Sequence, residues 1–217
     1  MKKLNMYKHD TKGYLITFCG LDGCGKSTMI HMLSELIQRE VFLTKQPTDN
    51  VRQTAIFRTY MDEPNHSTYD YRSLALLAVS DRVQHCNKVI FPQLENGKAV
   101  ISDRYFYSCL ANLRARGYKN DKWIYQISES LIKPDLSIFL DVPVELAVSR
   151  VRSRKEEKDR YIDMELQYKL RKEYLNIAEK NNGIILSTKQ EPEETFKAIK
   201  NHLIKLEDRK VKYEFKT

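Results

Sequence analysis

The sequence lacks the features that mark membrane proteins, secreted proteins and metal-binding domains. No run approaches the roughly 18 apolar residues that a membrane-spanning helix needs. The basic start, MKKLNMYKHDTKG, has no apolar core behind it, so we expect no secretory signal. The cysteines form no C-x-x-C pair and no Cys/His metal spacing. We therefore expect reduced thiols, a cytoplasmic location and no membrane partner.

Repeats, low-complexity segments and Pro/Gly/Ser-rich linkers are also absent, so we interpret residues 1–217 as one domain. Within it, residues 1–12 and 208–217 are expected to form peripheral tails. The chain has 37 basic and 29 acidic side chains, which gives a net charge of +8. This charge indicates an anionic partner, but it does not by itself separate nucleic acid from nucleotide phosphate.

Short β-rich runs alternate with longer helical runs, which predicts an α/β fold with a parallel sheet covered by helices. We expect strands at residues 14–19, 41–45, 98–102, 136–141 and 184–187. Helices are expected at about 27–39, 52–60, 71–95, 107–115, 121–132, 163–180 and 192–207, and a further helix is expected to open at Pro143. Gly97 is placed to end the longest of them.

The clearest motif is 20-GLDGCGKST-28, which matches G-x-x-x-x-G-K-[ST] between a predicted strand and a predicted helix. Such a loop points backbone N–H groups at phosphate oxygens and adds the positive end of the helix. We expect Lys26 to reach the β- and γ-phosphates of ATP and Ser27 to bind Mg²⁺. The whole segment is expected to bind the nucleotide: Gly20, Leu21, Asp22, Gly23, Cys24, Gly25, Lys26, Ser27 and Thr28.

A phosphate loop alone does not choose between classes of nucleotide-binding protein. A switch GTPase also needs an N-K-x-D segment, but Asn87-Lys88 continues as Val-Ile inside a predicted helix. An ATPase motor is usually larger and coupled to other domains. The remaining class is a small kinase that acts on a small phosphate acceptor.

Other charges lie where a kinase needs them. Asp103 and Arg104 follow a predicted strand, and ligands of open α/β sheets bind beyond the carboxyl ends of strands. There an aspartate can orient Mg²⁺ or its water and an arginine can grip a phosphate; the alternative is a helix-capping aspartate beside a surface arginine. The charged stretch 150–162 is either a solvated helix end or a mobile basic lid whose arginines close over the triphosphate.

Several ordered segments resemble the thymidylate kinase family of P-loop nucleoside monophosphate kinases, over about residues 14–203. They are ITFCGLDGCGKST, LALLAVSDRVQH, FPQLENGKAVISDRYFYS, PDLSIFLDVPVELAVSRVRSR and KDRYIDMELQYKLRKEYLNIA. The resemblance implies a five-stranded parallel sheet flanked by helices on both faces. It also implies phosphoryl transfer from Mg·ATP to the 5′-phosphate of a deoxynucleoside monophosphate, dTMP in the family, and usually a homodimer.

The match also implies roles for single residues. Asp22 corresponds to the acid that meets the acceptor sugar, and Arg82 and Arg104 correspond to the arginines that hold the acceptor phosphate. Cys24 stands where some members carry a loop arginine, which implies a catalytic arginine from the lid, Arg154 or Arg152. The same match places Lys45, Tyr105 and Ser108 on the acceptor side, and Lys26 and Asp103 among the catalytic groups.

Three departures leave the acceptor open. Ala78 replaces a phenylalanine that stacks on thymine in the family, and the candidates for a replacement ring are Tyr69, Tyr71, Tyr105 and Tyr107. The motif T-R-E-P reads 44-TKQP-47, with Gln46 in place of the glutamate, and a tyrosine–glutamine pair reads Asn112-Leu113. The alternatives to dTMP are another pyrimidine monophosphate or a nucleoside. A nucleotide-dependent nucleic-acid-binding protein is disfavoured, because the basic residues cluster at the lid and tail.

Overall fold

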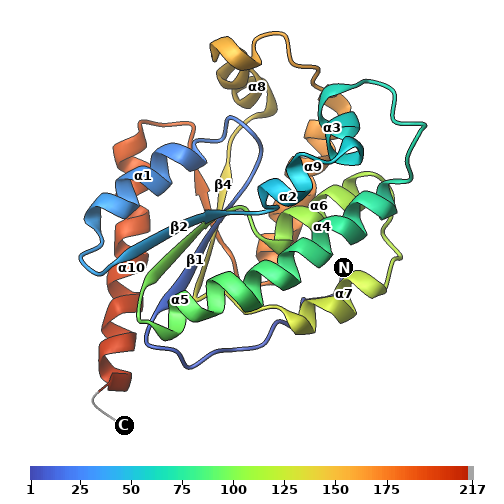
Figure 1. The fold of residues 1–217 in the computed structure, drawn as a ribbon. Coiled ribbons are helices and arrows are strands. Elements are labelled where there is room, and N and C mark those ends of the chain that lie inside the picture. Colours follow the sequence, from blue (N-terminus) through green and yellow to red (C-terminus); the bar gives the residue numbers. More distant parts are fainter. Residues whose placement is uncertain (215–217) are drawn as a thin grey trace.

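A five-stranded, all-parallel sheet forms the centre of the computed structural model, which describes residues 1–214 and the side chains up to Lys210. The strand order is β2-β3-β1-β4-β5 (Figure 1). The strands are β1 (Tyr14–Cys19), β2 (Val41–Lys45), β3 (Ala99–Asp103), β4 (Leu136–Asp141) and β5 (Ile184–Ser187). The α/β fold with a five-stranded parallel sheet is confirmed, and only β3 differs from its expected range, by one residue.

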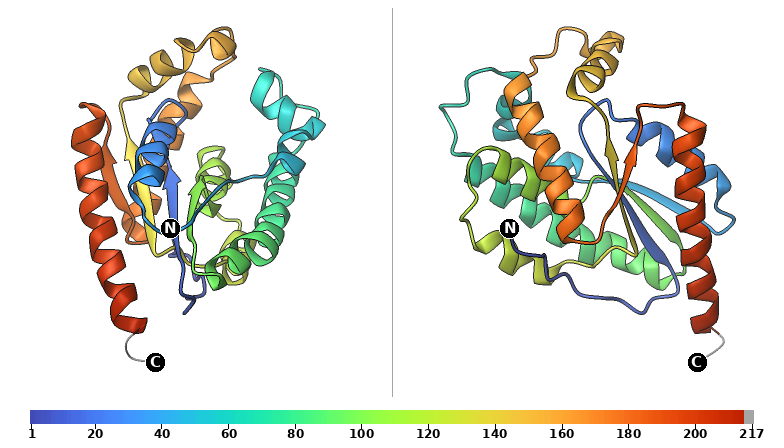
Figure 2. Two further views of the ribbon diagram at one scale, coloured as in Figure 1. Left: turned by 60° about the vertical axis from the view of Figure 1, so that its left-hand side comes forward. Right: turned by 180° about the vertical axis from the view of Figure 1, so that it is seen from behind.

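Helices cover both faces of the sheet, as Figure 2 shows. On one face lie α1 (Lys26–Leu36) and α10 (Pro192–Glu214), which pack on each other. On the other face lie α4 (Tyr71–His85), α5 (Phe91–Glu95), α6 (Phe106–Ala115) and α9 (Met164–Lys180). Because both faces are covered, β1 is buried along its whole length and its sequence shows no polar alternation.

The register between β1 and β3 positions the loops that follow both strands. Phe18 pairs with Asp103, so the phosphate loop after β1 and the Asp103-Arg104 pair leave the sheet side by side. The Arg104 N–H also donates to the Phe18 carbonyl at 2.8 Å. After β1 the chain runs outward to β2 and returns through β3, then crosses to β4 on the other side. This reversal makes the carboxyl end of β1 the place where an open α/β sheet binds ligands.

The helix expected at residues 71–95 is a continuous helical stretch with one wider turn inside it. A π-helical turn, Cys86–Ile90, separates α4 from α5. Pro92, which follows this turn, has no backbone N–H to continue the α-helical hydrogen bonds. The stretch ends as expected at Gly97, whose φ is +77°.

Several element boundaries differ from the sequence expectation. The helix expected at 52–60 is two helices, α2 (Asp49–Arg52) and α3 (Ala55–Asp62), because Thr54 between them caps α3 by accepting the Phe57 N–H. The helix expected at 121–132 is only α7 (Trp123–Ile127) and a 3₁₀ turn. The helix after Pro143 is α8 (Val144–Arg152), and α1 ends three residues early.

The two expected tails are both corrected. Residues 208–214 continue α10, and only 215–217 lie outside the described residues. In the segment before β1, Leu4 and Met6 are buried against the core, and the Leu4 N–H donates to Asn181 Oδ1 at 2.9 Å. Both segments are therefore anchored to the domain by packing and hydrogen bonds.

Asp135 joins these segments at the amino end of the sheet. Its carboxylate lies 3.0 Å from His9 Nε2, accepts the Leu15 N–H at 2.8 Å and lies 3.5 Å from Lys210 Nζ. Burial acts to raise the pKa of Asp135, but the contacts with His9, Leu15 and Lys210 outweigh it and hold the pKa below its usual value. Within residues 1–214, no helix has the length and apolar character needed to cross a bilayer.

Replacing Asp135 with asparagine tests this anchor, since it keeps the shape and removes the charge. We expect Asp135→Asn to lower the free energy of unfolding at pH 7 by about 1–3 kcal/mol. Folding depresses the carboxyl pKa, so the contribution is complete above the unfolded-state pKa of about 3.9 and is lost as the pH falls through the folded-state value. Urea unfolding at pH 7, 5 and 3 measures the difference; a gap between wild type and variant that stays constant down to pH 3 contradicts the assignment.

Candidate active site

The phosphate loop joins β1 to α1 in a conformation that only glycine adopts without strain. Gly23 has a φ of +81°, and a Cβ there would lie 2.1 Å from the Ala147 carbonyl oxygen of α8. Gly25 has a φ of +87° and is the N-cap of α1. Glycine has no side chain to cap the helix, and the first turn of α1 carries no acidic residue. The backbone N–H groups and the positive end of α1 are thus available to an anion.

Lys26, at the start of α1, folds back over this loop. Its Nζ donates to the Leu21 carbonyl at 2.8 Å and to the Gly20 carbonyl at 3.4 Å, and it lies 3.8 Å from Cys24 Sγ. The side chain is buried, so its charge is held at a fixed place beside the loop. A fixed cation at this position is what binding of the terminal phosphates of a nucleotide requires.

Ser27 and Asp103 line one groove between α1 and β2, together with Thr44 and Lys45. In the described part of the chain, Asp103 Oδ1 is buried and has no hydrogen-bond partner. No group of three or more His, Cys, Asp or Glu side chains is placed to hold a metal within that part. A buried carboxylate oxygen without a partner beside a serine hydroxyl fits Mg²⁺, because Mg²⁺ takes one or two protein ligands plus waters and phosphate oxygens.

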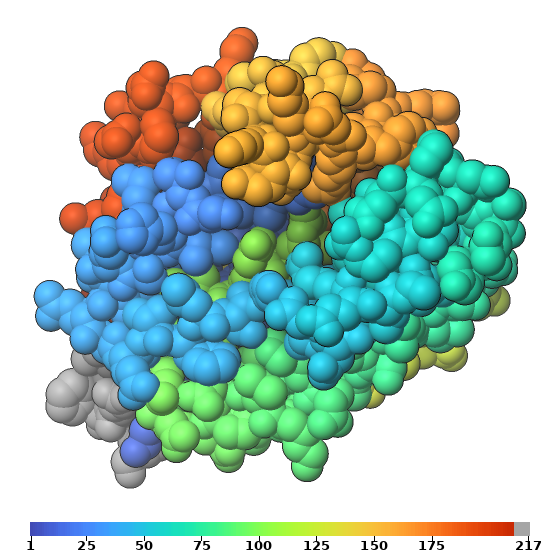
Figure 3. Space-filling view, turned by 45° about the horizontal axis from the view of Figure 1, so that its top comes forward, coloured from blue at the N-terminus to red at the C-terminus, as the bar shows by residue number. Residues whose placement is uncertain are grey.

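A cavity of about 300 Å³ lies on the other side of the loop, among α3, α4, α6 and α9. Figure 3 shows the hollow between α3, drawn cyan, and the segment after α8, drawn amber. Asp22 of the phosphate loop lines this cavity, and so does Arg104 at the end of β3. The cavity and the Ser27–Asp103 groove therefore lie on either side of the loop. Asp103, which lines the groove, is followed directly in sequence by Arg104, which lines the cavity.

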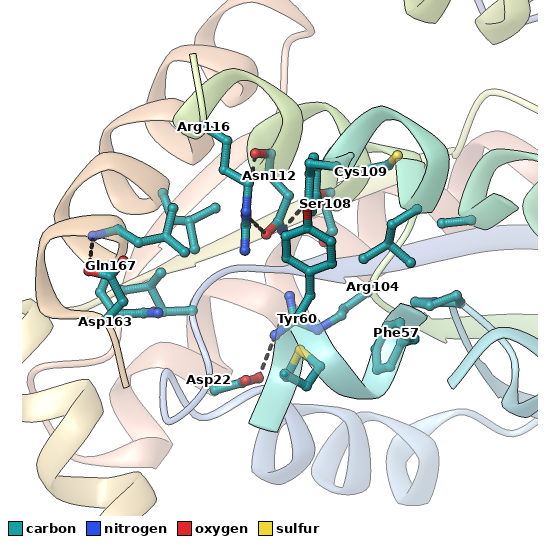
Figure 4. Close-up of a pocket in the computed structure, with 18 of the residues that line it drawn as sticks. Asp22, Phe57, Tyr60, Arg104, Ser108, Cys109, Asn112, Arg116, Asp163 and Gln167 are labelled. Carbon is teal, nitrogen blue, oxygen red and sulfur yellow. Dashed lines mark hydrogen bonds and ion pairs between the residues drawn. The ribbon is translucent and has the colours of Figure 1, made fainter. Parts of the chain in front are cut away.

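Asp22 and Arg104 form the ion pair that connects the loop to the cavity (Figure 4). Arg104 Nη2 lies 2.5 Å from Asp22 Oδ1, and Arg104 Nη1 donates to Gly20 O at 3.2 Å and to the Tyr174 hydroxyl at 2.9 Å. Arg104 has a φ of +66°, a left-handed conformation that is strained for arginine. The contacts on its backbone and side chain keep it there.

Asp22 also forms an ion pair with a second arginine, which belongs to the lid. Arg160 Nη2 lies 3.1 Å from Asp22 Oδ2. Burial acts to raise the pKa of Asp22, but the charges of Arg104, Lys26 and Arg160 prevail and hold it far below its usual range. Asp22 thus lies among three positively charged side chains.

Two more arginines face the same end of the cavity. Arg52 and Arg82 line the cavity together with Arg104. Burial and the positive charges of Arg104 and Arg82 lower the pKa of Arg52, although Asp103 and Asp22 act in the opposite direction. Arg82 is 2% exposed and donates Nη1 to the Ala78 carbonyl at 2.7 Å. Its Nε has no partner among the described residues. Converging cations with unused donors favour an anionic ligand.

The loop that carries Arg52 is held by Asp81. Thr48, the N-cap of α2, donates its backbone N–H to Asp81 Oδ2 at 2.8 Å, and its hydroxyl donates to Asp81 Oδ1. Arg52 Nε in turn donates to the Pro47 carbonyl at 2.8 Å. Asp81 therefore orients Arg52 through the loop without lining the cavity itself.

The far end of the cavity is aromatic. Tyr60 of α3 and Tyr71 of α4 lie with their ring centroids 5.0 Å apart, edge to face, and Tyr60 also lies 4.6 Å from the His66 ring. Further apolar or uncharged residues line the cavity, and Arg116 lines it too: Phe57, Met61, Leu74, Ala78, Cys109, Asn112 and Gln167. A flat, partly polar ring system fits between such walls.

The structure brings together most of the residues expected at the acceptor. Asp22, Arg82, Arg104 and Ser108 line the cavity, while Lys45 lies in the groove with Ser27 and Asp103 and pairs with Asp49. Thr28 is exposed, and Leu21 and Cys24 are buried within the loop.

The expectation that Tyr105 contacts the acceptor is wrong. Tyr105 is fully buried, and its hydroxyl donates to the Ile132 carbonyl at 2.6 Å, away from the cavity. Tyr107 is turned into the core in the same way, with its hydroxyl 3.0 Å from Ser137 Oγ. Of the four tyrosines considered as a replacement for the missing ring, Tyr71 alone lines the described cavity. Sequence reasoning missed Phe57 and Tyr60, whose aromatic spacing within α3 was the available signal.

The lid arginines are placed differently from the expectation. Arg160 reaches Asp22, whereas Arg154 Nη1 pairs with Glu157 at 3.3 Å and Arg152 is exposed. Neither Arg152 nor Arg154 lines the cavity in this structure. Arg154 is the N-cap of the 3₁₀ turn Lys155–Glu157, whereas Arg160 follows that turn.

Comparison with known proteins agrees with this geometry. Residues 18–199 match the family model for thymidylate kinase. A probable thymidylate kinase of Pyrococcus horikoshii is 40% identical over 173 residues, which cover 77% of this chain and 84% of that protein. One of Thermococcus kodakarensis is 41% identical over 168 residues, 74% and 82% of the two chains. A thymidylate kinase of Geobacillus sp. (strain WCH70) is 35% identical over 185 residues, 81% and 87%.

The close approach of Gly23 to the Ala147 carbonyl leads to a prediction about ATP binding. We expect Gly23→Ala to weaken ATP binding by at least about 10-fold, because the new Cβ meets the Ala147 carbonyl and displaces the loop. Gly97→Ala is the matched control, since Gly97 has a similar φ of +77° but its Cβ would meet only Lys12 Cβ at 3.7 Å. The control should lose about 1–2 kcal/mol of stability and keep ATP binding. Calorimetric titration decides; wild-type affinity in Gly23→Ala refutes the role of this turn.

Proposed function

The chain belongs to the thymidylate kinase family, and on this premise we propose that it transfers the γ-phosphoryl group of ATP to the 5′-phosphate of dTMP, giving dTDP and ADP. One observation carries the proposal. A phosphate loop and a cavity lined by three converging arginines meet at Arg104, which touches both Gly20 and Asp22. Two anion sites facing each other are what a kinase needs when its acceptor is itself a phosphate.

On the donor side, the loop binds the triphosphate through its backbone N–H groups, the end of α1 and Lys26. When the nucleotide binds, the Lys26 ammonium gives up its hydrogen bonds to the Leu21 and Gly20 carbonyls and donates to phosphate oxygens instead. Ser27 and Asp103 are the residues that would hold Mg²⁺, and that ion supplies neutralisation of the β- and γ-phosphate charge when bound.

On the acceptor side, Arg52, Arg82 and Arg104 bind the 5′-phosphate, and Asp22 accepts a hydroxyl of the sugar. The base lies at the aromatic end, beside Tyr60 and Tyr71. A nucleoside acceptor, the alternative left open by the sequence, would leave these three guanidinium groups without an anion. The cluster therefore favours a monophosphate.

Catalysis follows from positioning and charge, without a covalent intermediate on the protein. A loose, in-line transfer spreads negative charge over the moving group, and Lys26, Arg104 and a lid arginine are placed to stabilise it. We assign the lid role to Arg160, because it reaches Asp22 between the two anion sites. The lid also excludes water from the transfer, which prevents hydrolysis of ATP.

A homodimer remains a prediction from the family resemblance, and a cytoplasmic location remains a prediction from the cysteine pattern. Sedimentation of the purified protein tests the first, and cell fractionation tests the second.

The central assignments predict the loss of turnover with folding intact. We expect Lys26→Ala and Arg104→Ala each to lower kcat/KM for dTMP by at least about 10³-fold, because each removes a cation from the transferring phosphoryl group. A coupled assay of ADP release measures this, and circular dichroism checks the fold. Near wild-type kcat in either variant would refute the proposed site.

A second prediction separates the lid arginines. We expect Arg160→Met to lower kcat by about 10²–10³-fold, while Arg154→Met, the matched control two residues beyond the end of α8, stays within about 3-fold of wild type. Arg152→Met completes the series. If Arg154→Met or Arg152→Met is the variant that loses kcat while Arg160→Met keeps it, the lid role belongs to that residue and our assignment is wrong.

A further inference from the structure

Gln46 is a buried amide at the start of the loop that leads to Arg52. It directly follows β2, and the loop continues into α2, which ends at Arg52 and packs on α4 (Figure 1). The side chain is fully buried, and its Nε2 lies 3.1 Å from His85 Nδ1 and 3.6 Å from Cys86 Sγ. Its Oε1 has no hydrogen-bond partner among the described residues. The amide is therefore held through its nitrogen, and His85 provides the shorter contact.

The ring of His85 also contacts β2. His85 is the last residue of α4, just before the π-helical turn, and its Nε2 lies 2.9 Å from Thr44 Oγ1. An amide nitrogen only donates hydrogen bonds, so His85 Nδ1 must accept from Gln46, and the ring proton is then on Nε2. Burial lowers the pKa of His85, and the charge of Arg82 lowers it further against the opposing effect of Asp81. The ring is thus neutral at pH 7 and donates its Nε2–H to the threonine hydroxyl.

α4 holds the loop at two points, one on each side of Pro47. Asp81 accepts two hydrogen bonds from Thr48, and His85, one turn later in α4, holds the residue before the proline. The Pro47 carbonyl accepts the Arg52 Nε–H at 2.8 Å. The position of the Arg52 guanidinium therefore depends on both anchors, because it is bonded to the residue between them.

We propose that His85 is a positioning residue for the acceptor phosphate: its Nδ1 holds Gln46 and thereby fixes the loop that presents Arg52. The inference rests on the proposed function and adds to it a residue that lines neither the cavity nor the groove. Without this acceptor a buried amide N–H loses its partner, and the loop shifts to give it another one. Binding of the acceptor should weaken. ATP binding should change little, because it depends on the loop after β1, two strands away in the sheet.

Two substitutions of His85 separate the two nitrogens of the ring. Asparagine places its side-chain oxygen at the position of Nδ1, since both atoms are bonded to Cγ, whereas glutamine reaches the position of Nε2. We expect His85→Gln to raise the KM for dTMP by about 5- to 30-fold and to leave the KM for ATP within about 2-fold of wild type. His85→Asn should stay within about 3-fold of wild type for both substrates. The coupled assay of ADP release measures both constants.

Gln46→Met removes the other half of the same contact with little change in shape. It should raise the KM for dTMP by a similar factor of about 5- to 30-fold. The double variant with His85→Gln should raise it no further than either single variant, because both substitutions remove one interaction.

Asn181→Leu is the matched control. Asn181 is also a buried amide, whose Oδ1 accepts the Leu4 N–H at 2.9 Å and whose Nδ2 donates to the Ile177 carbonyl at 2.8 Å. Its replacement by leucine removes a buried amide of similar shape at the other end of the domain. The control should lower stability and keep the KM for dTMP of the wild type.

The position of the ring proton is tested on the wild-type protein, so this test does not depend on whether a variant folds. Long-range 1H–15N spectra of the histidine rings show which nitrogen carries the proton. The signals that are absent from His85→Asn assign those of His85. We expect a neutral ring at pH 7 with its proton on Nε2.

Three outcomes overturn the inference: a His85 ring protonated on Nδ1, a KM for dTMP in His85→Gln no higher than in His85→Asn, or an equal rise in Asn181→Leu. These results leave the proposed kinase activity standing, provided that the wild-type protein phosphorylates dTMP. If the wild-type protein does not phosphorylate dTMP, the proposed function fails first and the inference fails with it, whatever the spectra show.

Discussion

The contact between Arg104 and the phosphate loop is the constraint on which the site depends. One guanidinium touches the Gly20 carbonyl, the Asp22 carboxylate and the Tyr174 hydroxyl, so it fixes the loop, the cavity and α9 relative to one another. Its strained backbone is tolerated because the β1–β3 register supplies the bond from Arg104 N to Phe18 O. The sheet thereby sets the distance between the donor and acceptor phosphates.

Much of the fold was readable from the sequence. Four strands match their expected ranges. In β1 and β4, burial on both faces produces nearly continuous apolar runs bounded by turns, whereas the edge strands β2 and β5 are only partly buried. Asp22 and Arg104, both expected at the site, line the cavity and follow strand ends, where sheet topology decides the position. The length of α10 was missed because its last turns are highly charged and resemble a solvated tail, although Lys210 is anchored on Asp135.

The failures share a physical cause: they concern the direction of a side chain set by tertiary contacts. Tyr105 faces the core because its hydroxyl bonds the Ile132 carbonyl, far away in sequence. Arg160 was one of several basic residues in the lid, and only the turn before it distinguishes it from Arg154. Phe57 and Tyr60 are three residues apart in α3, but that α3 lies over the cavity is decided by tertiary packing.

Asp22, the counter-ion inside the cavity, also affects how the cavity distinguishes a nucleotide from orthophosphate. Any anion that enters must compete with Asp22, which already balances Arg104 and Arg160. Orthophosphate brings nothing to offset the rearrangement of this carboxylate, whereas a nucleotide also gains contacts with its sugar and base. The carboxylate inside the arginine cluster therefore favours a ligand that also fills the sugar and base positions over a bare phosphate.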